Sequence, residues 1–251
     1  MKQLIAWNWK MAWNRCESLA LVRSLREIPA LSPSEKSEIL LLPSFTALGE
    51  VGEAIAGVPG FLLGAQNFYP ALRGAYTGEV GVDALRELGC AYVLVGHPER
   101  RARGESASDI AAKIAFALEH ELCVLLCLGE THEQRVADRV AATLTSQFTD
   151  ALAQAPRVLS PERLTLAYLP TWGDSCATML GTPEIIHAHG LLRSLLVETF
   201  AEAGWRMRII LGGARVQDIA AQALPLDNVD GLLLEDPSLE PAIIALIAAL
   251  A

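Results

Sequence analysis

The stretch Tyr92–Arg101, YVLVGHPERR, joins a short apolar run to the start of a helix through polar residues. The run Tyr92–Val95 is continuous rather than alternating, which is typical of a parallel strand buried on both faces. Pro98 suits the first position of a helix, because the N–H that it lacks would have no partner there. The stretch therefore predicts one strand–helix unit, with His97 and Glu99 at the point where the strand ends.

Seven more apolar runs recur along the chain, and amphipathic stretches such as Ser106–His120, Thr131–Gln154 and Pro183–Ala203 lie between runs. Thr182 is the expected N-cap of the last of these helices. The runs are Leu4–Trp7, Ile39–Leu42, Phe61–Ala65, Cys123–Leu128, Leu164–Ala167, Arg208–Leu211 and Gly231–Leu234. Eight units without a linker favour an α/β fold, a single-domain (β/α)8 TIM barrel over residues 1–251. A doubly wound open sheet is the alternative, weakened because no G-x-G-x-x-G follows the first run.

Composition narrows the classes of partner. The net charge is −9 and the basic residues are scattered, which argues against a nucleic-acid partner. No apolar run reaches the roughly 18 residues that span a bilayer, and the N-terminal residues do not form a signal-peptide core, so we expect no membrane partner and a cytoplasmic protein. Five cysteines suit buried thiols, and no Cys/His spacing is typical of zinc, so neither a metal nor a cofactor is expected.

In a (β/α)8 barrel the chemistry lies where the strands end at their C-terminal side. The residues worth testing are therefore the polar ones that follow each run. They are Asn8 and Lys10 after the first run, His97 and Glu99 after the fourth, Asp174 after the sixth, Gly212–Arg215 after the seventh, and Glu235 and Asp236 after the eighth.

Six segments occur in the order found in one enzyme family: Asn8–Met11, Gly64–Glu79, Gly96–Arg101, Gly104–Ser106, Cys127–Glu130 and Gly212–Gly213. On these the chain resembles the triosephosphate isomerases. The resemblance implies that Lys10 is the electrostatic catalytic lysine and His97 the electrophilic histidine. It also implies substrate-binding positions, namely Asn8, Glu99, Gly212 and Gly213.

Elementary electrostatics agrees with two of these roles. A lysine at a barrel mouth stabilises the negative charge that develops on an enediolate oxygen. A histidine at a helix N-terminus is disfavoured as a cation, so it donates as a neutral imidazole. The plainer interpretation is that Asn8, Lys10, His97 and Glu99 form a polar network that only supports the mouth.

The chain departs from the family at two functions. Leu169 occupies the position of the catalytic base, and a leucine cannot accept a proton. The phosphate site is altered, because Ala214 replaces a serine, Arg215 follows it, and Glu235 and Asp236 replace a Gly-Gly pair. The loop Gly173–Ala177 is also changed. We expect Arg215 to pair with Glu235 or Asp236 and fill the hollow where phosphate would lie.

A general base contributes typically ~10²–10⁴ in rate, so losing both functions predicts little or no isomerase activity on glyceraldehyde-3-phosphate and dihydroxyacetone phosphate. Two alternatives stay open. One is an aldose–ketose isomerase acting on another, non-phosphorylated carbonyl compound, with Asp174 as a replacement base. The other is a structural or regulatory dimeric binding protein.

The loop Arg73–Glu79 predicts a partner. In the family the matching loop reaches into a second subunit, with Thr77 near the partner's site, and its motif is intact here. We therefore expect a homodimer through Arg73–Glu79. A small carbonyl compound is the other expected ligand.

Overall fold

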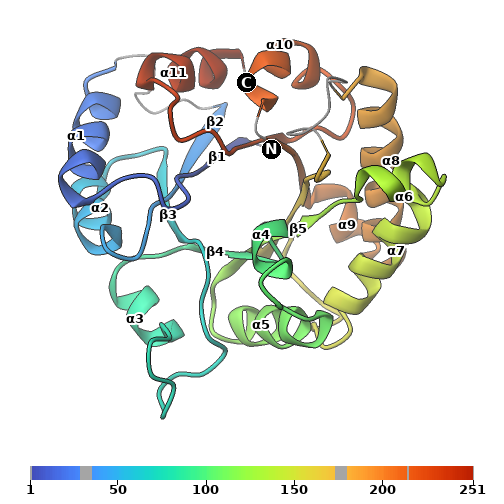
Figure 1. Ribbon diagram of the computed structural model, residues 1–251, viewed down its shortest axis with the longest axis horizontal. Coiled ribbons are helices and arrows are strands. Elements are labelled where there is room, and N and C mark those ends of the chain that lie inside the picture. Colours follow the sequence, from blue (N-terminus) through green and yellow to red (C-terminus); the bar gives the residue numbers. More distant parts are fainter. Residues whose placement is uncertain (1, 29–35, 173–179, 214, 251) are drawn as a thin grey trace.

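Eight parallel strands close into one barrel in the computed structural model, which describes residues 2–28, 36–172, 180–213 and 215–250. Each strand pairs with the next, and the eighth pairs with the first (Figure 1). The strands are β1 (Gln3–Asn8), β2 (Ser37–Leu42), β3 (Phe61–Ala65), β4 (Tyr92–Val95), β5 (Cys123–Leu128), β6 (Leu164–Tyr168), β7 (Arg208–Gly213) and β8 (Gly231–Leu234). The predicted (β/α)8 barrel is confirmed.

The helices lie outside the barrel and surround it (Figure 1). They are α1 (Arg15–Arg26), α2 (Leu48–Ile55), α3 (Val82–Glu87), α4 (Pro98–Arg101), α5 (Ala107–Glu119), α6 (His132–Val136), α7 (Val140–Ala151), α8 (Thr182–Phe200), α9 (Glu202–Arg206), α10 (Ala220–Ala223) and α11 (Pro241–Leu250). Two 3₁₀ turns, Pro161–Arg163 and Val216–Ile219, precede β6 and α10.

Two predicted helices are shorter than the sequence pattern indicates. The stretch Thr131–Gln154 divides into α6 and α7, and Asp138 between them has a φ of 54°. The stretch Pro183–Ala203 divides at Ala201, whose φ is 50°. The prediction that Thr182 caps α8 was also wrong. Thr182 is inside the helix and Gly181 is the N-cap, because the extended backbone that a cap requires falls one residue earlier.

Alternation along the strands sorts the apolar side chains into two cores. Leu4 and Ala6 of β1 point into the barrel, whereas Ile5 and Trp7 pack outward against the helices. Leu233 of β8 likewise lies in the inner cluster, and Leu232 and Leu234 lie in the outer one. Side chains alternate along a strand with period two. The next residue after an outward-facing one is therefore directed toward the barrel axis.

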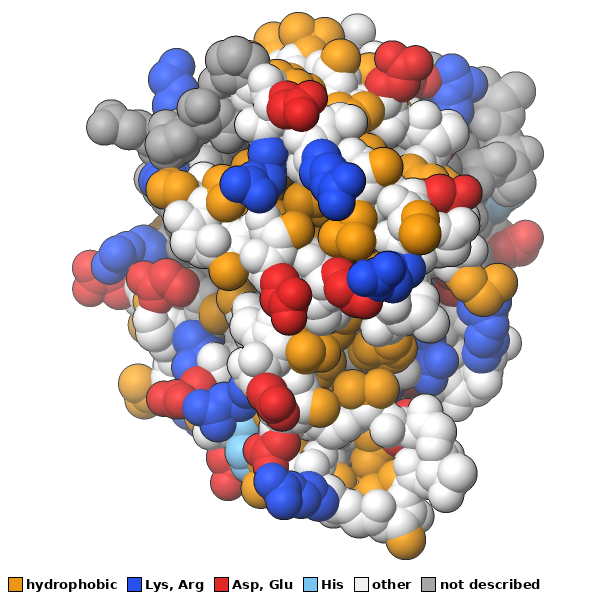
Figure 2. Space-filling view, turned by 90° about the vertical axis from the view of Figure 1, so that its left-hand side faces the viewer, with side chains coloured by type: hydrophobic (Ala, Val, Ile, Leu, Met, Phe, Trp, Pro, Cys, Tyr) orange, Lys and Arg blue, Asp and Glu red, His pale blue; other side chains and the backbone are white. Residues whose placement is uncertain are grey.

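Acidic and basic side chains are interspersed on the face shown in Figure 2, which is the left-hand side of Figure 1, where α1 and α2 lie. In the part of the chain that the structure describes, no helix is both long and apolar enough to cross a membrane. Cys16, Cys90, Cys123 and Cys127 are free thiols.

Candidate active site

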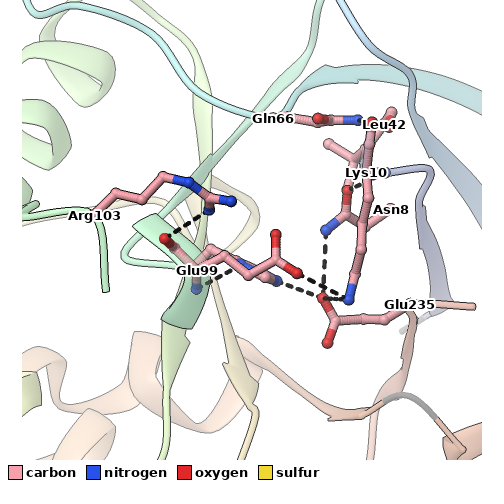
Figure 3. A network of polar contacts seen from close by, with 8 residues as sticks. Asn8, Lys10, Leu42, Gln66, Glu99, Arg103 and Glu235 are labelled. Atoms are coloured by element: carbon pink, nitrogen blue, oxygen red, sulfur yellow. Dashed lines mark hydrogen bonds and ion pairs between the residues drawn. The ribbon is translucent and has the colours of Figure 1, made fainter. Parts of the chain in front are cut away.

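Three strand ends bring five polar residues together at one end of the barrel. Asn8 ends β1 and Lys10 follows it, His97 and Glu99 follow β4, and Glu235 follows β8. Figure 3 shows Asn8, Lys10 and Glu235 pointing toward one another, with Glu99 on the other side of the Lys10 amine. The predicted grouping of Asn8, Lys10, His97 and Glu99 is therefore present in space, and Glu235 joins it.

Lys10 has a backbone conformation that is costly for a lysine. Its φ is 51°, in the left-handed region, where a side chain crowds the following carbonyl at a cost of roughly 1–2 kcal/mol. Two contacts hold it there. Lys10 N donates to Asn8 Oδ1 at 3.0 Å, and Gln66 Nε2 donates to Lys10 O at 2.8 Å. Gln66 also donates to Leu42 O at 2.8 Å, which ties this turn to β2.

The Lys10 amine lies between two carboxylates. Its Nζ is 3.2 Å from Glu99 Oε1 and 3.9 Å from Glu235 Oε1. The Glu99 side chain is about half exposed, whereas that of Glu235 is almost fully buried. The solvent-exposed ion pair of Lys10 with Glu99 contributes little to stability. The attraction between Lys10 and the buried Glu235 is screened less by water.

His97 is the N-cap of α4, and its hydrogen bonds define its tautomer. Its Nδ1 accepts from the backbone N–H of Glu99 at 3.2 Å, so Nδ1 carries no proton. The neutral ring then holds its proton on Nε2, which donates to Glu235 Oε1 in a short hydrogen bond. The side chain is 6% exposed. With Nδ1 as acceptor from the backbone, Nε2 of His97 is the ring nitrogen that points toward Glu235 in the mouth.

Glu235 is the centre of the cluster. Its Oε1 accepts hydrogen bonds from His97 Nε2 and, at 3.4 Å, from Asn8 Nδ2. The same oxygen forms an ion pair with Lys10 Nζ at 3.9 Å. Burial raises the pKa of the Glu235 carboxyl, but the hydrogen bond from His97 and the positive charge of Lys10 lower it more, so the pKa lies below its ordinary value. The carboxylate is therefore ionised at neutral pH.

Leu169 points into the inner core of the barrel. It is 3% exposed and belongs to the inner apolar cluster with Ala167 and Leu233. Its N–H donates to Leu128 O at 2.7 Å, which continues the pairing of β6 with β5. Leu169 thus closes the barrel interior below the mouth.

The buried carboxylate of Glu130 fixes the backbone around Leu169. It accepts from Arg135 Nε at 2.9 Å, Tyr168 OH at 3.0 Å and Trp172 Nε1 at 2.9 Å. Thr171 N donates to Glu130 O at 3.0 Å. The sequence places Glu130 after the fifth strand, but the apolar spacing gives no signal of this role.

The residues of the altered phosphate site do not form the predicted ion pair. Arg215 contacts Asp218 Oδ2 at 2.7 Å, three residues on, and so the prediction that it pairs with Glu235 or Asp236 is wrong. Asp236 Oδ1 accepts from Ser238 N at 2.8 Å and Ser238 Oγ at 2.6 Å. These short-range partners are reached at a smaller entropy cost than partners on another loop.

Gly212 and Gly213 end β7, next to the mouth. Ala214, Asp174 and the loop Gly173–Ala177 lie outside the described residues. Among those described, no group of three or more His, Cys, Asp or Glu side chains could hold a metal ion. A cavity of about 490 Å³ opens beside the cluster, lined by residues that include Pro98, Glu99, Gly129 and Thr171.

Comparison with known proteins identifies the relatives of the chain. The family model described as "Triosephosphate isomerase" matches residues 3–250. A triosephosphate isomerase of Nitratidesulfovibrio vulgaris is 41% identical over 96% of both chains, and that of Aquifex aeolicus is 33% identical over 96% of both. The crystal structure of triosephosphate isomerase from Bartonella henselae superposes with a TM-score of 0.88 at 28% identity, covering 100% of this chain and 99% of that one.

These relatives contradict the prediction of little or no isomerase activity, and the two alternatives offered with it. Proteins 41% identical over 96% of the chain have the name of an ordinary isomerase. The prediction rested on the loss of the base at Leu169 together with the altered phosphate site, and it did not include Glu235, whose carboxylate contacts His97 and Lys10. The period-two alternation of β8 contained that signal, because Leu234 faces outward and Glu235 follows it.

Proposed function

Because this chain belongs to the triosephosphate isomerase family, we propose that it interconverts glyceraldehyde-3-phosphate and dihydroxyacetone phosphate. One observation carries the proposal. Three nitrogen donors, His97 Nε2, Asn8 Nδ2 and Lys10 Nζ, surround the single oxygen Glu235 Oε1. Such a set of donors suits an oxygen that gains negative charge during a reaction, as the oxygen of an enediolate does.

The chemistry follows from this arrangement. A substrate carbonyl oxygen that takes the place of Glu235 Oε1 meets a neutral N–H donor from His97 and the positive charge of Lys10. Both become stronger partners when the oxygen becomes negative, so they stabilise the transition state more than the bound substrate. Asn8 also fixes the Lys10 turn through Lys10 N, and so it orients the cation as well as the substrate.

We propose that the phosphate end is held by the backbone at the end of β7, beside Gly213, at the altered site that includes Arg215 and Asp236. Asp236 is turned to Ser238, and Arg215 to Asp218, so each side chain is engaged within its own loop. Gly213 has no side chain, and an added Cβ there would meet nothing within 4 Å, so its backbone is open to a ligand.

We also propose that the protein acts as a homodimer in the cytoplasm. The loop Arg73–Glu79 extends from the barrel with exposed residues, among them Tyr76 at 44% exposure. The free thiols at Cys16, Cys90, Cys123 and Cys127 suit a reducing compartment.

The direct test is an isomerase assay of the purified chain in both directions, coupled to a nicotinamide-linked dehydrogenase. We expect saturable turnover, and a loss of at least about 10²-fold in kcat/KM for K10M, because the cation that faces the developing charge is gone. K2M removes an exposed lysine far from the cluster and serves as the control. Absence of turnover in the wild-type chain, together with absence of hydrogen exchange between substrate and solvent, would overturn the proposed function.

A further inference from the structure

We propose that Glu235, delivered by β8, is the general base that moves the substrate proton between its two carbons. The proposal rests on the proposed isomerase function and adds the group that this function still lacks. Proton removal next to a carbonyl requires a base at the site, and Leu169 has no ionisable group. Glu235 is a carboxylate in direct contact with both His97 and Lys10.

Two other acidic side chains near the mouth, Glu130 and Glu99, have surroundings that suit a base less well than those of Glu235. Glu130 is fully buried, but Arg135, Tyr168 and Trp172 all donate to it, away from His97. Glu99 contacts Lys10 with a side chain that is 48% exposed, so it is solvated. Within the described residues, Glu235 is the carboxylate that contacts the His97 ring.

The distances that proton transfer needs are compatible with the Glu235 position. A carbonyl carbon lies about 1.2 Å from its oxygen. If that oxygen accepts from His97 Nε2, a base within about 3 Å of the neighbouring carbon lies within a few ångströms of the same nitrogen. Glu235 Oε1 is in contact with Nε2, so a rotation of the Glu235 side chain that admits the substrate oxygen leaves the carboxylate beside the carbon next to it.

Displacement by substrate also makes the carboxylate more basic. In the free protein the pKa of Glu235 is raised by burial and lowered more by the hydrogen bond from His97 and the charge of Lys10. A substrate oxygen that takes over the His97 donor removes part of the lowering effect, whereas burial persists. The pKa of Glu235 then rises toward the value that suits a base near neutral pH.

The proton balance closes without another reactant. Glu235 takes the proton from the carbon next to the carbonyl, the C–H electrons form the carbon–carbon double bond, and the carbonyl electron pair moves to oxygen. His97 Nε2 and Lys10 Nζ face that oxygen, and His97 exchanges a proton between the two substrate oxygens. Glu235 then gives its proton to the other carbon, which yields the isomer with no net oxidation.

The test compares E235Q, E235D and E235A with the wild-type chain. E235Q keeps the size and an acceptor for His97 but cannot take a proton, so we expect kcat to fall about 10²–10⁴-fold with KM within about tenfold. E235D should retain intermediate activity, because its carboxylate is one methylene further away. Formate should restore part of the turnover of E235A by supplying a carboxylate in the space left by the side chain. The acid limb of kcat/KM seen in the wild-type chain should be lost in E235Q.

E105Q is the matched control. Glu105 is a second buried carboxylate, 3% exposed and paired with Lys113 away from the cluster. Its neutralisation has a similar stability cost, so E105Q controls for losses of folding, and its kcat should stay within about threefold of wild type. Thermal unfolding of each variant verifies that the chain is folded at the assay temperature.

Two results separate the inference from the function that it rests on. If the wild-type chain turns over and E235Q or E235A is equally fast or faster, Glu235 only occupies the mouth and the inference is overturned while the proposed function stands. If the wild-type chain neither turns over nor exchanges substrate hydrogen with deuterated solvent, the proposed function fails and the inference fails with it. Loss of exchange in E235Q alone supports the base.

Discussion

The side chain of Leu169 packs against Gly212 so closely that a Cβ added to Gly212 would lie 2.9 Å from Leu169 Cδ1. The leucine therefore fills the inner core where β6 and β7 end, and a polar group in its place would be buried among apolar neighbours.

The first prediction concerns a carboxylate at this position. We expect L169E to gain no activity and to lower the free energy of unfolding by roughly 2–5 kcal/mol, because it removes a buried leucine and buries a charge. L169M, which keeps the volume, should cost less than about 1.5 kcal/mol. Chemical denaturation and the isomerase assay measure both effects. A tenfold rise in kcat for L169E would show that the base belongs at position 169, directly after β6.

The second prediction concerns two glycines in opposite surroundings. A Cβ on Gly129 would lie 2.0 Å from the carbonyl oxygen of Leu169, so G129A must displace backbone and should cost at least roughly 1–3 kcal/mol. Gly190 in α8 has nothing within 4 Å of its added Cβ. G190A should therefore gain about 0.5–1 kcal/mol, because alanine favours a helix. Urea unfolding of both variants measures the change in the free energy of unfolding. Equal changes in the two variants would refute the claim that Gly129, and not Gly190, is the crowded position.

The third prediction concerns the stability of the protein in acid. His189 of α8 is buried, and burial lowers its pKa to about 4, although its hydrogen bond to Asn228 O opposes this. The folded chain thus resists protonation that the unfolded chain accepts below about pH 6.5. The contribution of neutral His189 to the free energy of unfolding is fully present above pH 6.5. It is lost as the pH falls toward 4, at a cost of roughly 3 kcal/mol.

H189N should flatten this loss, since asparagine keeps a donor toward Asn228 O but does not titrate. The measurement is the free energy of unfolding of both chains between pH 7 and pH 4. If the difference between wild type and H189N is constant across this range, His189 does not contribute to the acid sensitivity.

The fourth prediction concerns assembly. Light scattering should give twice the 27.0 kDa chain mass, and T77E should shift the protein toward the monomer, because it places a charge at the tip of the loop proposed to enter the partner. V158E adds the same charge at a residue that is 92% exposed elsewhere and should leave the mass unchanged. A wild-type chain that is monomeric at micromolar concentration contradicts the proposed dimer.

The barrel was predictable because its signal is local and repeated. Continuous apolar runs need burial on both faces, and all eight predicted runs lie within the observed strands. The breaks at Asp138 and Ala201 were not predictable from apolar spacing, since a positive φ at a residue other than glycine depends on tertiary packing.

The candidate site was predicted in part. The sequence motifs predict the four polar residues at the barrel mouth, Asn8, Lys10, His97 and Glu99. Their contacts follow from the closure of the barrel. The inward direction of Glu235 follows from the faces of β8, where Leu233 points inward and Leu234 outward, whereas the family pattern predicts a phosphate-binding role at this position. The partner of Arg215 was missed because the prediction paired it with acidic residues on the adjacent loop, whereas Asp218 lies only three residues along the chain.

In the closed order of the strands, β8 and β6 stand two places apart, on either side of β7, and so about a quarter turn separates them around the barrel axis. An enediolate is planar and has two faces, and the face that receives the proton decides the handedness of the new carbon centre. The strand that supplies the acid therefore takes part in setting the stereochemistry of the product. A barrel in which that strand changes can alter its selectivity between mirror-image substrates without any change in its backbone.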